Sequence, residues 1–215
     1  MATSTAMVAI GNEETQDVDA ILGYSADITF NNHTLDYTGS TPSFGTTDVT
    51  YVDNKGKTKL TSIAFDGVGK NPGIYTVTPK NASIEGISSG WEWAWAYDLN
   101  YHSGTLIING VIYVDNLQDY NYDGGPHQAV PVVKLVDNTS VSSSNYTVDY
   151  KRDGVTTTDF TSAGEITVIV TGKTANYYTG VKTLTYNILE GQMTVTGNNY
   201  SGTYDGQPHT VTATP

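Results

Sequence analysis

The 215-residue chain contains no cysteine, a single arginine and no long apolar segment. Without cysteine, neither a disulfide nor a cysteine-ligated zinc site can stabilise the fold. Because no run approaches the roughly 18 apolar residues that a membrane-spanning helix needs, we expect no membrane insertion within this segment. The net charge of −12 and the pI of about 4.4 repel phosphate backbones, so we expect no nucleic-acid partner.

Sequence signatures of metal centres are also missing. The zinc-binding pattern H-E-x-x-H does not occur, and none of the four histidines has metal-ligand spacing. Two of them, His127 and His209, belong to a repeated turn, and active-site residues are seldom copied into every module of an array. This recurrence indicates a role in turn packing. We therefore expect no catalytic residue, no metal site and no cofactor.

A repeated turn is the feature around which the chain is organised. Residues 122–127 read Tyr-Asp-Gly-Gly-Pro-His and residues 204–209 read Tyr-Asp-Gly-Gln-Pro-His, a spacing of 204 − 122 = 82 residues. A looser copy, Tyr-Thr-Gly-Ser-Thr-Pro, occupies residues 37–42. Asp-Gly favours a tight turn with positive φ, and proline ends a hydrogen-bonded ladder. A period this long, in a chain rich in Thr, Tyr, Val and Gly, predicts tandem small β-domains.

The first module is expected at residues 24–109. Short β-strand patterns bounded by turn residues recur through it. They lie at residues 26–30, 49–52, 61–65, 74–77 and 104–108. Residues 53–56, Asp-Asn-Lys-Gly, separate the second pattern from the third and predict a hairpin turn.

The second module is expected at residues 110–190 and repeats this order. Residues 146–150 alternate apolar and polar side chains, which is typical of a strand buried on one face. The Arg-Asp-Gly sequence at 152–154 predicts a hairpin at the place where residues 54–56 predict one in the first module. The two modules are therefore expected to share one topology, joined by short linkers near residues 109–110 and 190–191.

Both modules also share their closing strands. Residues 162–168 match residues 71–77 position for position, and residues 183–188 are aligned with residues 105–110. The alternation predicts that the closing strands bury one face each, formed by Leu106 and Ile108 and by Leu184, Tyr186 and Ile188. Six or seven short strands in about 80 residues predict an all-β fold of tandem Ig-like sandwiches.

The two ends of the chain contain no complete module. Residues 1–23 fit a linker or the tail of a preceding module, and equally a short helix over residues 13–22 that is capped by Asn12. Residues 191–215 contain the second Tyr-Asp-Gly copy and are expected to be the truncated start of a third module. Because so short a segment cannot bury a core, we expect it to be poorly ordered or loosely docked on the second module.

Several of these motifs together resemble a family of bacterial Ig-like repeats. The Tyr-Asp-Gly-x-Pro-His turn, residues 145–148 and residues 177–180 before a Thr-Leu-Thr-Tyr-Asn-Ile strand are similar to YDG domains. Residues 71–77 and 101–108 resemble the MBG variety. The resemblance covers about residues 24–215. It implies a non-enzymatic stalk or adhesin region, outside the cell, of a large bacterial cell-surface or secreted protein, with neighbouring Ig-like modules as partners.

One segment is not shared between the modules. From Val77 to Leu106 there are 29 positions, against 16 from Val168 to Leu184, so the first module carries 13 extra residues. All three tryptophans of the chain lie in this segment. The segment is therefore the candidate for a function that the repeat itself does not need.

The extra segment contains an aromatic row at every second position. Its members are Trp91, Trp93, Trp95 and Tyr97. On an extended strand they share one face, and exposed aromatic rings can stack on sugar rings. The alternative function is accordingly a carbohydrate-binding module for a host or environmental glycan. The competing interpretation is that the row packs inward or against a neighbouring module.

A calcium site is a further candidate, in the repeated turn of the second module. Asp119, Asn121 and Asp123 alternate before Gly124, as in the opening of an EF-hand loop. The twelfth position is Val130, where a bidentate glutamate is needed, and the sister turn lacks the charges. The pattern therefore favours a strand and turn over a metal loop, and we expect no metal.

Overall fold

The computed structural model describes residues 24–86, 97–191, 196–197, 201–208 and 213–214. Within these ranges the regular structure is β-strand, apart from three-residue 3-10 helices at Thr46–Asp48 (η2), Ser143–Asn145 (η4) and Thr174–Asn176 (η5). The predicted all-β fold is confirmed. The helix considered at residues 13–22 lies outside the described residues.

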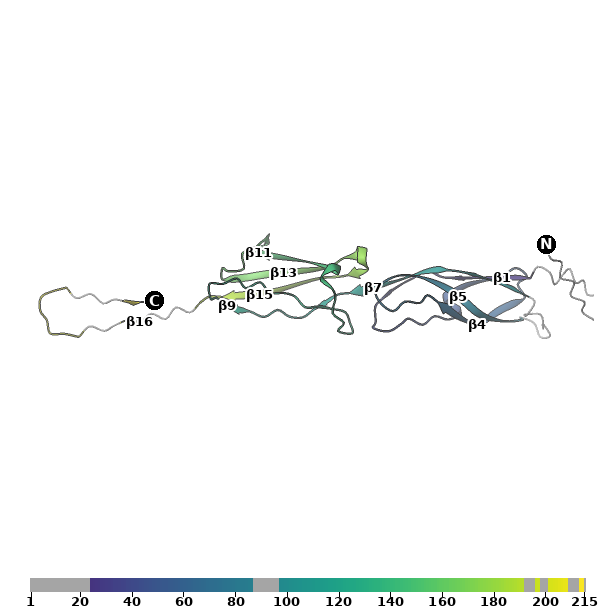
Figure 1. Ribbon diagram of the computed structural model, residues 1–215, viewed down its shortest axis with the longest axis horizontal. Coiled ribbons are helices and arrows are strands. Elements are labelled where there is room, and N and C mark those ends of the chain that lie inside the picture. The colour runs from purple at the N-terminus through teal and green to yellow at the C-terminus, as the bar shows by residue number, and fades with distance from the viewer. Residues whose placement is uncertain (1–23, 87–96, 192–195, 198–200, 209–212, 215) are drawn as a thin grey trace, which may run out of the picture. The chain divides into compact units, whose positions relative to one another are not determined.

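The chain divides into two compact units, Met1–Ile108 and Asn109–Pro215 (Figure 1). The division falls one residue before the boundary that the sequence predicts. Strand β7 (Gly104–Val111) continues through it, so Asn109 and Gly110 are strand residues and not the linker that we expected there.

The first sheet of unit 1 is built around strand β1 (Ser25–Phe30). Strand β3 (Val49–Asp53) pairs with one edge of β1 in antiparallel fashion, and strand β6 (Asp98–His102) pairs with the other edge in parallel. The alternating burial of β1 places Ala26, Ile28 and Phe30 on its inner face.

The second sheet of unit 1 is organised by the long strand β5 (Gly73–Gly86), which changes partner along its length. Its first five residues pair with residues 104–108 of β7, and the remainder pairs with β4 (Thr58–Asp66). Strand β2 (His33–Asp36) adds to β7.

Aromatic contacts join the two sheets of unit 1 across its core. The ring of Phe30 on β1 meets Phe65 on β4 edge-on at 5.4 Å between centroids, and it meets Phe44 edge-on at 5.0 Å. Both arrangements are favourable for aromatic quadrupoles. Unit 1 is thus a two-sheet sandwich closed by a phenylalanine cluster, which we define as Phe30, Phe44 and Phe65.

Unit 2 contains a five-stranded sheet with strand β13 (Gly164–Gly172) at its centre (Figure 1). Its order is β12 (Val155–Thr156), β11 (Tyr146–Arg152), β13, β15 (Val181–Leu189) and β9 (Tyr120–Asn121). The β15–β9 pairing is parallel, and the other pairings are antiparallel.

A second layer of unit 2 contains the ribbon of β8 (Tyr113–Val114) and β10 (Val133–Lys134), and β14 (Tyr178–Thr179) pairs with residues 110–111. The core residues alternate along the strands of both layers, which is the pattern of a sandwich. They are Ile112, Ala129, Val133, Leu135, Val141, Ile166, Val168, Val170, Tyr186 and Ile188. The predicted Ig-like sandwich architecture is confirmed.

One predicted hairpin is wrong. Strand β3 belongs to the first sheet of unit 1 and β4 to the second, so residues 53–56 carry the chain from one sheet to the other. The corresponding turn in unit 2 is a true hairpin, since Arg152 pairs with Val155 across it.

The predicted alignment of the closing strands is also wrong, by two residues. Gly73 pairs with Ile108 and Gly164 pairs with Ile188, so the counterpart of Tyr186 is Leu106. Tyr186 and Ile188 are buried as expected, whereas Leu184 is only half-buried. The predicted alignment matched Thr105-Leu106 with Thr183-Leu184 by residue type. The register is set instead by the pairing of each closing strand with β5 or β13.

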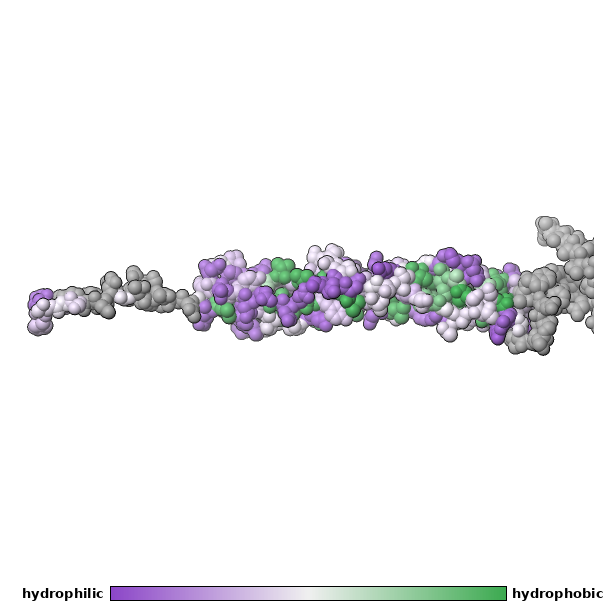
Figure 2. Space-filling model, turned by 90° about the horizontal axis from the view of Figure 1, so that it is seen from below, coloured by the Kyte–Doolittle hydropathy of each residue, from purple (hydrophilic) through white to green (hydrophobic). Residues whose placement is uncertain are grey.

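The described part of the C-terminal segment forms a small ribbon of its own. Strand β16 (Thr196–Gly197) pairs with β17 (Ala213–Thr214) in antiparallel fashion. Over the described part of the face seen in Figure 2, hydrophobic residues (green) are interspersed with hydrophilic ones (purple). No helix among the described residues has both the length and the apolar character needed to cross a membrane.

Candidate functional site

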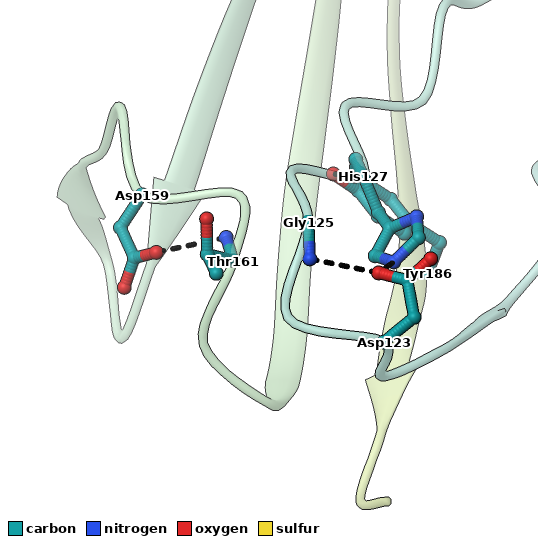
Figure 3. Close-up of polar contacts among 6 residues, drawn as sticks. All are labelled: Asp123, Gly125, His127, Asp159, Thr161 and Tyr186. Carbon is teal, nitrogen blue, oxygen red and sulfur yellow. Dashed lines mark hydrogen bonds and ion pairs between the residues drawn. The ribbon is translucent and has the colours of Figure 1, made fainter.

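The repeated turn of unit 2 is held together by the side chain of Asp123 (Figure 3). Its Oδ1 accepts hydrogen bonds from the Gly125 backbone N–H and from His127 Nε2, both at 2.8 Å. Gly124 lies between them at φ +84°, a conformation that glycine adopts without a steric cost. The sequence therefore forms the predicted Asp-Gly turn, and the carboxylate closes it from within.

His127 fixes this turn to the body of unit 2. Its ring stacks on Tyr120, with 5.1 Å between centroids, and its backbone N–H donates to the Phe160 carbonyl at 2.7 Å. The Tyr186 hydroxyl donates to the His127 carbonyl at 2.8 Å. The turn-packing role predicted for His127 is confirmed by these contacts.

A second loop, residues 157–163, lies beside the turn (Figure 3). Asp159 Oδ1 accepts the backbone N–H groups of Thr161 and Ser162 at 2.9 and 3.0 Å. The Arg152 guanidinium donates to the carbonyls of Asp159, Ser162 and Ala163. The only arginine of the chain is thus used to order this loop, a role that sequence reasoning missed.

Both carboxylates of these loops favour the ionised form. Hydrogen bonds from Ser162 and the backbone of Thr161 lower the pKa of Asp159 to about 2. The Gly125 N–H and then His127 lower the pKa of Asp123. Neither carboxylate is poised to exchange a proton near neutral pH, so neither suits general acid–base chemistry.

The geometry of the Asp123–His127 pair is that of a structural contact. The Nε2 atom of His127 faces Asp123, whose side chain is 66% exposed. Among the hydrogen bonds of the described residues, none places a serine, threonine or tyrosine hydroxyl on the His127 ring as a nucleophile would require. The pair stabilises the backbone of the turn, and the described hydrogen bonds include no nucleophile that His127 could activate.

The residues of the calcium candidate do not converge. Asp119 Oδ1 accepts the backbone N–H of Asn187 at 2.7 Å, whereas Asp123 serves its own turn. Asn121 lies in β9, opposite Leu189. Within the described ranges, no group of three or more His, Asp and Glu side chains is placed to hold a metal ion.

Of the predicted aromatic row, only Tyr97 lies among the described residues. Trp91, Trp93 and Trp95 lie outside the described residues. Tyr97 is only 8% exposed and stacks on Tyr24 at 5.1 Å between ring centroids. Tyr97 therefore does not offer an open ring face to a sugar, and for this residue the competing interpretation, inward packing, holds.

Tyr97 instead completes a network around Asp53, where the chain crosses between the sheets of unit 1. Asp53 Oδ1 accepts the Lys55 N–H, and Oδ2 accepts the Lys57 N–H, the Thr58 N–H and the Thr58 hydroxyl, all at 2.7–2.8 Å. The Tyr97 hydroxyl donates to Oδ2 at 3.2 Å. We name this cluster the Asp53 corner.

The electrostatics of the Asp53 corner follow from these contacts. Burial acts to raise the pKa of Asp53, but the hydrogen bonds from Lys55, Thr58 and Lys57 outweigh it and lower the pKa to about 2. Burial, and then the negative charge of Asp53, raise the pKa of Tyr97 to about 12. Asp-Asn-Lys-Gly at residues 53–56 is a turn signal in the sequence, but the hydrogen bond from Tyr97 to Asp53 is not visible there.

The remaining histidines are dispersed. The His33 ring contacts those of Phe30 and Phe44, and its Nε2 is 3.5 Å from Asp48 Oδ1. His102 Nε2 lies 2.8 Å from Asp27 Oδ1. His209 is outside the described residues. Each described histidine faces one carboxylate on its own unit, which is a local packing arrangement.

Comparisons with known proteins add little to this geometry. No protein-family model matches the chain, and no curated protein matches it. Among solved structures, titin domains Z1Z2 in complex with telethonin show 11% identity and a TM-score of 0.32, over 79% of this chain and 96% of that one. Drosophila N-cadherin EC1-4 shows 11% identity and a TM-score of 0.28, over 75% of this chain and 49% of that one. Likeness at this level is too weak to bear on function.

Proposed function

We propose that this chain is a non-enzymatic structural or adhesive repeat region, a stalk or spacer, of a large bacterial cell-surface or secreted protein. The resemblance of its motifs to bacterial Ig-like repeats of the MBG and YDG type supports the bacterial, extracellular assignment. Its parts are a module at residues 24–109, a module at 110–190 and the start of a third at 191–215.

The observation that carries this proposal is that polar residues of the turns and loops form hydrogen bonds within their own module. The side chains of Asp123, His127 and Asp159 form hydrogen bonds within the turn and within the neighbouring loop. Asp53 does the same in unit 1. Polar side chains that bind the backbone of their own turns stabilise the shape of a module, which is what a spacer requires.

Single-molecule stretching of the whole chain tests the spacer role. With about 80 residues in each unit and at most about 3.6 Å per extended residue, each unfolding event should lengthen the chain by roughly 250–300 Å. We expect two such events in each trace. One event that releases both units together, or extension without any force peak, would contradict independent load-bearing modules.

Carbohydrate binding is the second candidate, and the concentration of all three tryptophans in one inserted segment favours it. Because Trp91, Trp93 and Trp95 are the only tryptophans, the fluorescence of the intact chain reports on this segment alone. A glycan that stacks on them should shift or quench the emission in a saturable manner. Emission that stays constant across a panel of neutral and acidic polysaccharides would leave only the spacer role.

A further inference from the structure

Strand β11 lies at the margin of the five-stranded sheet of unit 2 over most of its length. We propose that residues 146–148 of this strand pair in antiparallel fashion with the same residues of a second copy of the chain. Thr147 then lies on the two-fold axis that relates the two copies. This binding surface is independent of the spacer role and of carbohydrate binding.

The sheet order leaves the outer side of β11 largely uncovered. Only the two residues of β12 lie outside it, and they pair with Lys151 and Arg152 at the far end of the strand. On its inner side, β11 pairs with β13 over residues 146–151. Among the described residues, no strand therefore lies beside the outer side of residues 146–148 (Figure 1).

A single hydrogen bond shows which backbone groups of β11 point outward. The Tyr150 carbonyl accepts the N–H of Thr157, which follows β12 on the outer side, at 3.0 Å. Because successive residues of a strand direct their backbone groups to opposite sides, Tyr146 and Val148 also turn their N–H and C=O outward. No hydrogen bond among the described residues occupies these four groups.

The register of the pairing follows from the groups that a second strand can reach. The Tyr150 carbonyl is already bound to Thr157, so the outward groups of Tyr146 and Val148 are the ones available. When Tyr146 of each copy pairs with Val148 of the other, four backbone hydrogen bonds form. The symmetry then sets Thr147 opposite Thr147 of the second copy, as a non-hydrogen-bonded pair whose side chains lie close together.

The side chains of β11 are compatible with this register. Thr147 and Asp149 are exposed on the outer face, and a facing pair of threonines is a favourable cross-strand pair. The position opposite Asp149 is Asn145 of the second copy, so no two carboxylates face each other. Residues 146–148 contain no charge, proline or glycine, which are the features that commonly protect an exposed strand from pairing.

The corresponding sheet margin of unit 1 is irregular. Strand β4 lies at the end of its sheet, and its ladder with β5 has two register shifts, between Leu60 and Ser62 and between Ser62 and Ala64. Bulges of this kind twist a strand away from regular pairing. The ladder of β11 with β13 is continuous over residues 146–151, so β11 offers a second copy a regular strand.

The charge of the chain opposes the contact. Each copy carries a net charge of −12, so two copies repel each other over a distance that dissolved salt shortens. Four backbone hydrogen bonds also form only a small interface. We therefore expect a weak dimer whose population rises with the protein concentration and with the salt concentration.

Crosslinking of the full chain through an introduced cysteine tests the proposal. Because the chain contains no cysteine, Thr147→Cys supplies its only thiol. Facing cysteines in a non-hydrogen-bonded pair are close enough to form a disulfide. Under mild oxidation, we expect Thr147→Cys to form a covalent dimer several-fold faster than either of two control variants.

The controls are exposed positions on the same face of the sheet. Asp149→Cys sets the two thiols about 13 Å apart along the paired strands. Thr183→Cys lies on β15, two strands away from β11. Equal rates for the three variants would indicate random collision and overturn the proposal. Faster crosslinking of Asp149→Cys than of Thr147→Cys would refute the register.

Hydrogen exchange gives a second test that needs no cysteine. The amides of Tyr146 and Val148 should exchange several-fold more slowly in concentrated than in dilute solution, whereas the Thr147 amide, which faces β13, should not change. Thr147→Lys sets two like charges on the axis and should remove this concentration dependence, and Thr183→Lys should preserve it. Exchange at Tyr146 and Val148 that is independent of concentration in the unmodified chain would show that β11 binds no second copy.

Discussion

The turns at residues 53–56 of unit 1 and 152–154 of unit 2 match in sequence position but direct the chain differently. After β3 in unit 1, residues 53–56 take the chain from one sheet to the other, whereas after β11 in unit 2, Asp153 and Gly154 fold the chain back onto the same sheet. Both sequences carry a polar residue before glycine. A turn signal therefore predicts where a strand ends, and the packing around it decides which strand comes next.

The two turns differ in what their aspartates contact. Asp53 accepts hydrogen bonds from Lys55, Lys57, Thr58 and Tyr97, and so joins β3, β4 and the residue before β6. Asp153 and Gly154 have φ values of +51° and +80°, as in the two-residue hairpin turn whose twist matches that of its strands. In the hairpin of unit 2, the backbone twist suffices, because β11 and β12 pair with each other. Residues 53–56 join strands of different sheets, so side chains must satisfy the backbone groups that have no neighbouring strand to pair with.

We expect the largest effect for the phenylalanine cluster, which only unit 1 has. Phe30→Ala removes a ring that is 1% exposed and breaks both edge contacts of the phenylalanine cluster. Loss of a buried ring and the cavity left behind should lower the free energy of unfolding of unit 1 by about 3–5 kcal/mol. Hydrogen exchange should show faster exchange in β1, β4 and β5, with β13 and β15 unchanged.

The matched control for this change is Val155→Ala in unit 2, where the side chain is 70% exposed. Its effect should stay within about 0.5 kcal/mol. Faster exchange in β13 of Phe30→Ala would show that the two units share stability, and the comparison between them would fail.

The Asp53 corner should have an intermediate effect. Asp53→Asn keeps one acceptor oxygen and introduces an amide among donors, so several hydrogen bonds to a charged group are lost or weakened. We expect unit 1 to lose about 1–3 kcal/mol, as measured by denaturant unfolding followed in the strands of that unit. Asp153→Asn, at the corresponding turn of unit 2, should change the stability by less than about 0.5 kcal/mol. Equal losses for the two variants would mean that both turns depend on their carboxylates.

Tyr186 and Leu106 occupy the same register position, and the hydroxyl is the difference between them. Tyr186→Phe removes the donor to the His127 carbonyl but leaves the ring in the core. Unit 2 should lose about 1 kcal/mol, with faster amide exchange confined to the turn at residues 122–127. Tyr113→Phe, on a side chain that is 46% exposed, is the control and should be near neutral. Exchange that stays slow in the turn of Tyr186→Phe would assign the anchoring to the His127–Tyr120 stack.

Acid should reveal the Asp53 corner through a smaller, pH-dependent effect. The pKa of Asp53 is about 2 in the folded chain and 3.8 as a reference, so its stabilisation is present above about pH 4 and is lost as the pH falls through 2. Asp53→Asn should flatten this part of the stability curve of unit 1, and Asp153→Asn should not. Because solvent screens a half-exposed carboxylate, the change is smaller than the loss in Asp53→Asn at neutral pH. Identical acid profiles in wild type and Asp53→Asn would place the titrating group elsewhere.

Much of the fold was predictable from local patterns. Strands β1, β3, β4, β11 and β15 overlap the predicted segments. A strand that buries one face has apolar side chains at every second position, and this alternation can be recognised in the sequence. The turn at residues 122–127 was predictable because Asp-Gly and Pro dictate backbone angles locally. Its second copy shows this most directly, since the Asp205–Gln207 contact forms in a segment that is wholly exposed.

The candidate site was less predictable, because its residues meet across long sequence separations. Tyr97 lies 44 positions from Asp53, and its burial, which sequence spacing did not reveal, excludes it from an exposed row. The alignment of Leu184 with Leu106 failed for the same reason, since residue identity along one strand does not reveal which residue lies opposite on the next. Trp91, Trp93 and Trp95 stay a prediction.

The amino-acid sequence by itself determined the all-β class, the repeat and the conformation of its turn, because strand alternation and positive-φ glycines act over a few residues. Only the tertiary structure decided which strands pair, where the chain changes sheet and which aromatic rings are buried. The physical reason is that hydrogen-bond ladders and core contacts form between residues distant in sequence, and their free energy depends on partners that no local pattern specifies.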